Sequence, residues 1–495
     1  MEKQVEGCTG LSPLGGALSD ARARVPLLCV AMLLALALWL VGCGNSSGTG
    51  SSSTLPESTD TTKEATGTTI PPETVPPELA DRELELVQLM AEGSFSQVVL
   101  SFDETMAAAL PAAKLAEVWQ ALEQQTGGFV EPSGVRMETA GGYRPVIVTG
   151  LFGEAKIDIR IVFDDQDRVA GLFFKPSETA YVSPSYVDPA AFTESEIAVE
   201  NGEIRLPATL SVPLGGGPFP AVVLVHGSGP NDRDETFGPN KPFRDLAQGL
   251  ATAGIVVLRY DKRTFVYGQE ADFSVPTVKE ETVDDALAAF ALLRGVQDVD
   301  LSRTFILGHS LGGMLMPRIA VEAPQAAGFV LLAAVARPLE DLILAQNRYL
   351  LSLDPGRNSD SEAESGLAEL EKQVQKVKDP GLAADTPAVE LPLGIPAAYW
   401  LDLRGYEPAT AAKAIDQPLL VAQGGRDYQV TEQDFEMWRD ALSDRADVTF
   451  AFYPELNHLF VEGEGVSRPS EYLVEGHVAE GVVEDISAFV STAVR

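Results

Sequence analysis

From residue 221 onward, short apolar segments alternate with amphipathic helical patterns, and this alternation restricts the fold more than any other feature of the sequence. The apolar segments are Ala221–Val225, Ile255–Arg259, Thr304–Leu307, Phe329–Leu332, Leu419–Ala422 and Val448–Tyr453. The helical patterns are Phe243–Ala253, Thr282–Arg294, Met314–Val321 and Val482–Val494. Parallel strands are buried on both faces and need crossover connections, which are most often helices. We therefore predict an α/β fold, with a mostly parallel sheet, helices on both faces and Ile204–Val212 as an antiparallel edge strand.

The turn after Thr304–Leu307 carries a Gly-x-Ser-x-Gly sequence at residues 308 to 312. In a nucleophile elbow of this kind, a strained turn exposes the serine oxygen and the glycines let strand and helix pass close together. The same short pattern occurs at Gly44–Gly48, where no strand or helix surrounds it. Because a strand precedes Ser310 and a helix follows it, we predict that Ser310 is a nucleophile.

A second loop, His226–Gly229, follows the first strand of the series. Such a loop brings a backbone N–H group beside the elbow, where it forms an oxyanion hole together with the N–H of the residue after the nucleophile, here Leu311. We expect Ser228 to supply the second N–H, with Gly227 as the alternative. His226 would be out of chain order as a catalytic base, so we expect it to brace the loop.

Asp427 and His458 each lie in a turn that follows an apolar segment. A serine needs an imidazole to accept its proton, and a carboxylate must hold that imidazole in the right tautomer. The order Ser310, Asp427, His458 is the Ser…Asp…His order of α/β-hydrolases. Asp416 and Asp434 are alternative acids, although neither sits directly in a loop at the C-terminal end of a strand.

Charge and cysteine content exclude several other functions. The net charge of −36 repels phosphate backbones, so we expect no nucleic-acid partner. No cysteine follows Cys43, which excludes a disulfide framework, a CxxC redox pair and a cysteine zinc site from the folded part. We expect no cofactor and no metal, because no two histidines have metal-ligand spacing; the four are His226, His309, His458 and His477. His309 and His477 are expected to be structural.

The stretches His226–Glu235, Gly238–Phe243 and Leu258–Arg263, with the elbow and the Asp427 and His458 turns, are similar to bacterial α/β-hydrolases of the dienelactone-hydrolase and serine-aminopeptidase-like esterase group. The resemblance covers about residues 197–495 and implies hydrolysis of small carboxylic esters. Dienelactone hydrolases use a cysteine where this chain has serine, which counts against their particular substrate. A cell-surface peptidase or amidase for short peptides, and a non-catalytic binding protein of the same fold, remain alternatives.

Two further features belong to this part of the chain. Charged residues at 232–234 and 259–263 are expected to brace loops as ion pairs, with contact to substrate as the alternative. An insertion at about residues 336–415 is where α/β-hydrolases place a helical cap. Its Tyr399 and Trp400 would either line an acyl pocket or pack within the cap.

Residues 78–176 predict a small α+β domain, joined by a linker at residues 177–195 to the hydrolase domain at residues 196–495. Helices are expected at residues 84–90, 95–110 and 114–125, and strands at residues 143–151, 155–163 and 169–174. The order, and the sequence Gly171–Pro176, resemble an NTF2-like domain of the type found ahead of bacterial hydrolase domains. The segment has no histidine or cysteine, so we expect it to pack or bind rather than catalyse.

The N-terminus has the pattern of an export signal. Arg22 and Arg24 precede an uncharged run at Val25–Val41, and Leu40–Cys43 resembles a bacterial lipobox in which Cys43 carries lipid. We predict a signal peptide at residues 1–42, a Ser/Thr/Gly/Pro tether at residues 43–77 and a lipoprotein anchored to the outer face of the bacterial cell membrane. A plain membrane anchor or an ordinary signal peptide is the alternative.

Overall fold

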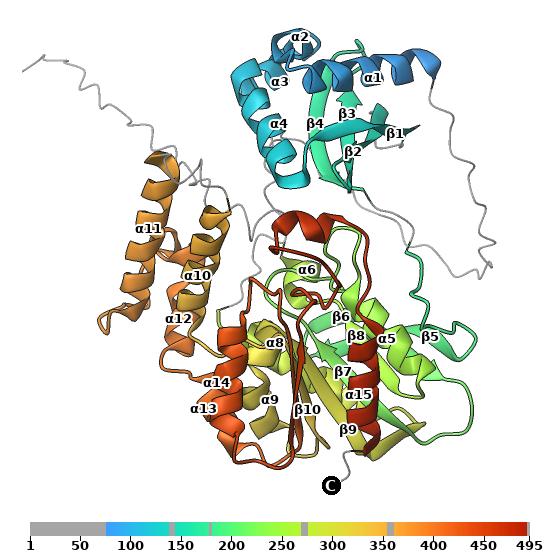
Figure 1. Ribbon diagram of the computed structural model, residues 1–495, viewed down its shortest axis with the longest axis vertical. Helices are drawn as coiled ribbons and strands as arrows, with labels where there is room; N and C mark the ends of the chain where they lie inside the picture. The colour runs from blue at the N-terminus through green and yellow to red at the C-terminus, as the bar shows by residue number, and fades with distance from the viewer. Residues whose placement is uncertain (1–75, 138–143, 178–180, 269–275, 354–360, 493–495) are drawn as a thin grey trace, which may run out of the picture.

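The computed structural model describes residues 76–137, 144–177, 181–268, 276–353 and 361–492, which form a small N-terminal domain and a larger C-terminal one (Figure 1). The expected signal peptide and Cys43 lie outside the described residues, as does nearly all of the expected tether. Within the described ranges, no helix has both the length and the apolar character needed to cross a membrane.

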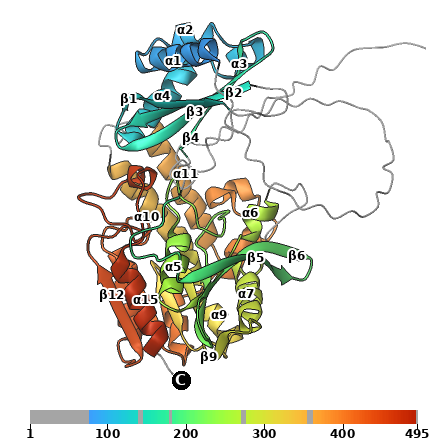
Figure 2. The same cartoon turned by 90° about the vertical axis from the view of Figure 1, so that its right-hand side faces the viewer.

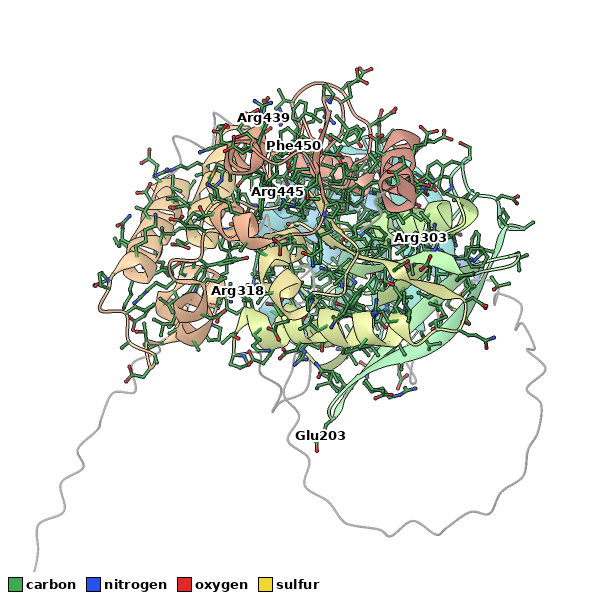
Figure 3. All side chains as sticks on the ribbon, turned by 90° about the horizontal axis from the view of Figure 1, so that it is seen from below. Glu203, Arg303, Arg318, Arg439, Arg445 and Phe450 are labelled. Atoms are coloured by element: carbon green, nitrogen blue, oxygen red, sulfur yellow. The ribbon has the colours of Figure 1, made fainter. Side chains whose placement is uncertain are left out.

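The larger domain is built on an eight-stranded sheet with the order β12-β11-β10-β9-β7-β8-β6-β5. The strands are β5 Phe192–Asn201, β6 Ile204–Pro213, β7 Phe219–Val225, β8 Val256–Tyr260, β9 Val299–His309, β10 Phe329–Leu332, β11 Leu419–Gly424 and β12 Val448–Tyr453. Strands β7 to β12 are mutually parallel, while β6 runs antiparallel to β8. The expectation that β6 forms the edge was wrong, because β5 pairs with it as a hairpin and takes the edge position. Glu203 lies at the tip of that hairpin (Figure 3).

Strand side chains alternate between two apolar layers, as the period of two in a strand requires. On β7, Val222 and Leu224 pack into one layer, whereas Ala221 and Val223 pack into the other. The first layer is covered by α5 Pro242–Thr252 and α15 Glu480–Thr492. The second is covered by α7 Asp284–Arg294, α8 Leu311–Met314, α9 Met316–Glu322 and α14 Glu432–Leu442. Figure 2 shows α7 and α9 on the opposite side of the sheet from α5 and α15. The predicted α/β fold with helices on both faces is confirmed.

The cap lies between β10 and β11, as predicted. It contains α10 Leu339–Ser352, α11 Ser361–Lys378, α12 Ala397–Leu403 and α13 Pro408–Ala411, with short 3-10 turns at η5 Ala388–Glu390, η6 Pro392–Gly394 and η7 Ala412–Ala414. Arg318 on α9 ties the cap to the core, because its guanidinium donates to the Asp402 carboxylate at 2.6 Å and to the Asp402 carbonyl at 2.8 Å (Figure 3).

The N-terminal domain packs helices on a four-stranded antiparallel sheet of order β1-β2-β3-β4. Its elements are α1 Pro77–Ala91, α2 Phe95–Val99, α3 Glu104–Ala109, α4 Ala112–Thr126, β1 Phe129–Met137, β2 Arg144–Phe152, β3 Ala155–Phe163 and β4 Val169–Pro176. The single helix expected at residues 95–110 is in fact two. The Asp103 side chain accepts the Met106 N–H at 2.6 Å and caps α3, while the Asp103 N–H donates to Val169 on β4.

The segment expected to be a linker, residues 177–195, is largely attached to the larger domain. Tyr181 donates its hydroxyl proton to Asp245 at 2.7 Å, and Tyr186 donates to the carbonyl of Val478 at 2.8 Å. β5 begins at Phe192, before the expected boundary. Contact between the two domains runs through a 3-10 helix of the larger one, η8 Pro469–Leu473, which meets α4 and β3.

Candidate active site

Ser310 lies between β9 and α8, on the turn that the sequence identified as an elbow. Its backbone has φ 52° and ψ −111°. This conformation costs a non-glycine residue on the order of 1–3 kcal/mol, and such strain is concentrated at functional sites. The turn is held in place because the Ser310 N–H donates to the carbonyl of Leu332 on the neighbouring strand at 2.9 Å. The serine therefore sits at the carboxyl edge of the parallel strands.

Two glycines of the elbow are required by close backbone approach. A Cβ on Gly308 would lie 2.5 Å from the backbone carbonyl carbon of Gly312, and a Cβ on Gly312 would lie 2.4 Å from the carbonyl oxygen of Val225. Side chains at these positions would push the elbow away from its own helix and from β7. The glycine spacing thus has the steric cause that the sequence analysis assumed.

Asp427 and His458 come together as predicted, from the loops after β11 and β12. The His458 Nδ1–H donates to Asp427 Oδ2 at 2.6 Å, and both residues are about 95% buried or more. The other carboxylate oxygen, Oδ1, accepts the backbone N–H groups of Gln429 and Val430 at 2.8 and 2.9 Å. Because the fixed carboxylate accepts a hydrogen bond from Nδ1–H, the proton stays on Nδ1 and Nε2 of the imidazole is left as the proton acceptor.

The alternative acids have other environments. Asp434 accepts hydrogen bonds from the Ala336 N–H and the Arg337 guanidinium, and it completes the capping box of α14. Asp416 is exposed. Neither contacts His458, and the carboxylate that does is that of Asp427. Ser310 Oγ makes no hydrogen bond to any residue in the described part of the chain. The hydrogen bond between a nucleophile and its base is often long in an enzyme without bound substrate.

His309 forms a buried ion pair beside the elbow that the sequence analysis missed. Its Nδ1 lies 3.0 Å from a carboxylate oxygen of Glu235, and its Nε2–H donates to the backbone carbonyl of His458 at 2.9 Å. Burial alone would lower the pKa of His309, but the Glu235 carboxylate outweighs it and raises that pKa. Burial would raise the pKa of Glu235, and the charge of His309 reverses this too. The pair joins the elbow to the loop that carries His458.

The oxyanion loop packs directly against the elbow, since a Cβ on Gly227 would lie 3.1 Å from the Cβ of Ser310. The Gly227 N–H donates to Glu235 at 2.7 Å and is therefore occupied. In contrast, the N–H groups of Ser228 and Leu311 make no hydrogen bond within the described ranges. Of the two candidates for the second oxyanion donor, Ser228 is the one whose N–H is available. Glu235 is the last residue of the stretch His226–Glu235, which resembles bacterial α/β-hydrolases. That resemblance is the sequence signal that could have identified Glu235 as part of the site.

The remaining histidines have bracing contacts. His226 is fully buried, and its Nε2 lies 3.0 Å from the Asp232 carbonyl. Burial lowers the pKa of His226 to about 4, so the ring is neutral at pH 7. The Nδ1 of His477 lies 3.2 Å from Asp245. Both positions agree with the structural roles expected for these two histidines.

The charged residues around the loop form ion pairs, as expected. Arg233 pairs with Asp261 at 3.0 Å, and Arg259 pairs with Asp234 at 2.9 Å. Within the cap, Tyr399 and Trp400 are 7% and 1% exposed and belong to the main apolar layer. Their burial favours packing over the alternative of an acyl-pocket lining.

Comparisons with known proteins give matches in both domains of the chain. A protein-family model described as alpha/beta hydrolase family matches residues 222–475. A second family model, described as a protein of unknown function (DUF3887), matches residues 84–172. Esterase EstD of Thermotoga maritima is 43% identical over 405 residues, which cover 82% of this chain and 93% of that protein.

Solved structures with similar folds include a dienelactone hydrolase from Anabaena variabilis, at 17% identity and a TM-score of 0.37. That match covers 62% of this chain and 100% of the other. An esterase from Pyrococcus furiosus matches at 15% identity and a TM-score of 0.40, over 65% of this chain and 98% of the other.

Proposed function

The chain belongs to the alpha/beta hydrolase family, and from this premise we propose that it is a serine esterase that cleaves small carboxylic esters through a covalent acyl-enzyme. This chain is similar to Esterase EstD over 93% of the length of that esterase, and this similarity supports a carboxylesterase-like hydrolase. One observation carries the mechanism. His458 and Asp427 are hydrogen-bonded at 2.6 Å at the same sheet edge as a serine in a strained elbow.

In the proposed acylation step, Ser310 Oγ attacks the carbonyl carbon of the ester while His458 Nε2 takes the hydroxyl proton. The tetrahedral intermediate then collapses, the C–O bond to the alcohol breaks, and His458 gives its proton to the leaving oxygen. Asp427 keeps Nδ1 protonated and stabilises the imidazolium that forms between these events. The products of this half-reaction are the free alcohol and an acyl group on Ser310.

Deacylation repeats the sequence with water as the nucleophile. His458 takes a proton from water, the hydroxide adds to the acyl carbon, and the bond to Ser310 Oγ breaks as His458 returns the proton. In both halves the carbonyl oxygen becomes negative. The N–H groups of Leu311 and Ser228 would then donate to it, each contributing about 3–4 kcal/mol to the barrier reduction.

Labelling with a fluorophosphonate tests this proposal, because the reagent bonds to an activated serine and loses fluoride. We expect the label on Ser310 and none on Ser310→Ala, which should also lose about 10⁴-fold or more of ester turnover. Ser302→Ala, at an exposed position of β9, is the control and should behave as wild type. Label on another residue, or turnover by Ser310→Ala within about tenfold of wild type, would refute the assignment. A panel of aryl esters and aminoacyl anilides would separate esterase from amidase activity.

We also propose that the enzyme is exported and held on the outer face of the bacterial membrane by lipid on Cys43. The support is the basic pair Arg22 and Arg24, the apolar run Val25–Val41 and the lipobox-like Leu40–Cys43. Cys43→Ser should leave the precursor uncleaved or release the protein from the membrane fraction. A variant that partitions and migrates like wild type would show that Cys43 is not lipidated.

A further inference from the structure

Lys262 is a buried lysine beside the oxyanion loop and takes no direct part in the chemistry above. It follows β8 by two residues, and its side chain is 3% exposed. The ammonium donates to the carbonyl of Gly227 at 2.8 Å, and its own backbone N–H donates to the carbonyl of Asn231 at 3.0 Å. Lys262 therefore holds the segment that follows β7 at two points, and one of them, Gly227, is in the oxyanion loop next to the expected donor.

The contact with Gly227 fixes the direction of the next N–H group. A peptide unit is planar and trans, so the carbonyl of Gly227 and the N–H of Ser228 point in opposite directions within one rigid plane. Holding the oxygen toward Lys262 therefore holds the Ser228 N–H on the other side. The preceding peptide is held as well, because the Gly227 N–H donates to Glu235. The ammonium also draws electron density from this peptide, which makes the Ser228 N–H a better donor.

The contacts of Lys262 also connect the oxyanion loop to the cap. The ammonium of Lys262 pairs with Glu281 at 2.5 Å, and the other carboxylate oxygen of Glu281 accepts the hydroxyl of Tyr399 at 2.6 Å. Tyr399 is on α12 of the cap, whereas Glu281 is on a π-helical turn, η3 Lys279–Val283, directly before α7. π-Helical turns are rare and frequently found at functional sites. A continuous buried chain thus runs from the cap through Tyr399, Glu281 and Lys262 to the oxyanion loop.

Arg263, the next residue in the chain, is a buried cation that only forms an ion pair, and Lys262 differs from it. Arg263 is buried to a similar depth and pairs with Asp285 at 2.5 Å. Burying a charge is costly unless it is paired, so both cations stabilise the fold only through their carboxylates. Lys262 differs because its ammonium also donates to a backbone carbonyl adjacent to the expected oxyanion donor. Only Lys262 can therefore affect how the transition state is bound.

We propose that Lys262 is a positioning residue that aims the Ser228 N–H at the oxyanion and connects the oxyanion hole to the cap through Glu281 and Tyr399. The proposal rests on the proposed esterase function. It is tested by Lys262→Met, which keeps the length of the side chain but removes the charge and the hydrogen bond. We expect kcat to fall by about 10–100-fold with KM changed less than about threefold, since removing an oxyanion donor outright costs about 10²–10³-fold.

Two readouts distinguish positioning from loss of folding. Rates are expressed per site titrated with fluorophosphonate, and the affinity for a trifluoromethyl ketone, which forms a tetrahedral adduct, should fall in parallel with kcat/KM. Arg263→Met is the matched control; it should lower the melting temperature and leave kcat per site within about twofold. Tyr399→Phe, which removes only the link to the cap, should lower kcat by about two- to fivefold.

If Lys262→Met fails to melt cooperatively, Lys262→Gln replaces it, since glutamine can still donate to Gly227 but carries no charge. We expect a loss of about tenfold in kcat for this variant. A folded lysine variant with kcat and ketone affinity per site within threefold of wild type would overturn the proposal. Absence of fluorophosphonate label on Ser310 of the wild-type protein would instead refute the esterase function itself, so the two failures are distinguishable.

Discussion

Two buried sites of the molecule hold ionisable side chains in opposite ways, although the N-terminal domain also contains a paired buried carboxylate, Asp158, which contacts Arg136. In the N-terminal domain, Glu83 on α1 is completely buried and has no cationic partner among the described residues. In the hydrolase domain, the buried Lys262 contacts the carboxylate of Glu281, and the buried Asp427 contacts the imidazole of His458. Those contacts also cross between loops that are far apart in the sequence. Paired burial therefore holds a constellation of groups in place, whereas isolated burial neutralises one group and lowers stability.

The apolar cores differ in a related way. Trp119 of the N-terminal domain packs against Phe129, Phe152 and Phe174 with ring centroids 5.4–5.9 Å apart. No histidine or cysteine occurs in residues 78–176. This domain therefore has a well-packed aromatic interior, and the division of chemistry and packing between the two domains stays a prediction.

Replacing Asp427 with asparagine should have the largest effect. An amide at this position would favour the wrong tautomer of His458, and we expect kcat to fall by about 10³–10⁴-fold with little change in folding. Asp434→Asn is a matched control, because Asp434 is also buried and follows the same strand but contacts Arg337. It should lower the melting temperature and leave kcat within about tenfold. Equal kcat losses in the two variants would contradict the role of Asp427.

Much of this arrangement could be predicted from local patterns. The apolar segments of the sequence predicted strands β7 to β12 to within a few residues. The turns that follow these segments identified Ser310, Asp427 and His458 as candidates. The elbow was identifiable because its geometry depends on consecutive residues, Gly308 to Gly312, whose steric needs are local. The sequence favoured Asp427 over Asp416 and Asp434 because it lies in a strand-end loop, but only folding determines which carboxylate reaches His458.

The missed features depend on contacts between distant segments or on irregular patterns. Lys262 and Gly227 are separated by 35 positions, and no local period connects them. The strand β1 was not predicted because register shifts at residues 129–131 and 132–134 interrupt its alternation. The helix expected at residues 95–110 breaks at Asp103, where a side-chain cap competes with continuation of the helix. Each error arose where tertiary contacts or capping outweighed the local pattern.

Replacing Glu83 with glutamine should change stability but not chemistry. Burial raises the pKa of Glu83 from 4.5 to about 9. The folded state therefore keeps a proton that the unfolded state loses between these values, so the free energy of unfolding falls as pH rises through that window. The variant stays neutral, and its calorimetric melting temperature should exceed that of wild type by several degrees at pH 8 and match it near pH 4.

The control for Glu83 is Glu85→Gln on the same helix, where the side chain is exposed. It should leave the melting temperature unchanged at both pH values. Ester turnover should be the same in both variants and in wild type. A Glu83→Gln protein that loses activity without losing stability would break the comparison, since it would place a functional carboxyl in the N-terminal domain.

Removing the N-terminal domain should have the smallest effect on the chemistry. A chain beginning at Tyr181 keeps the contact of that residue with Asp245, as well as all residues of the candidate active site. The surface uncovered is mainly η8, whose Leu473 packs at the edge of the N-terminal core. η8 is also held from the hydrolase side, since Asn240 donates to the Tyr472 carbonyl at 2.9 Å and Arg426 pairs with Glu471.

These anchors matter because Tyr472 packs against Tyr428, the residue after Asp427. If they suffice, the truncated chain should hydrolyse small aryl esters within about threefold of the longer protein per titrated site, with a slightly lower melting temperature. Leu473→Ser in the same truncated chain would reduce aggregation if newly exposed apolar surface were the cause of poor behaviour. A truncated chain that melts cooperatively and titrates with fluorophosphonate, yet loses nearly all turnover, would mean that the N-terminal domain holds η8 and the Asp427 loop in their active positions.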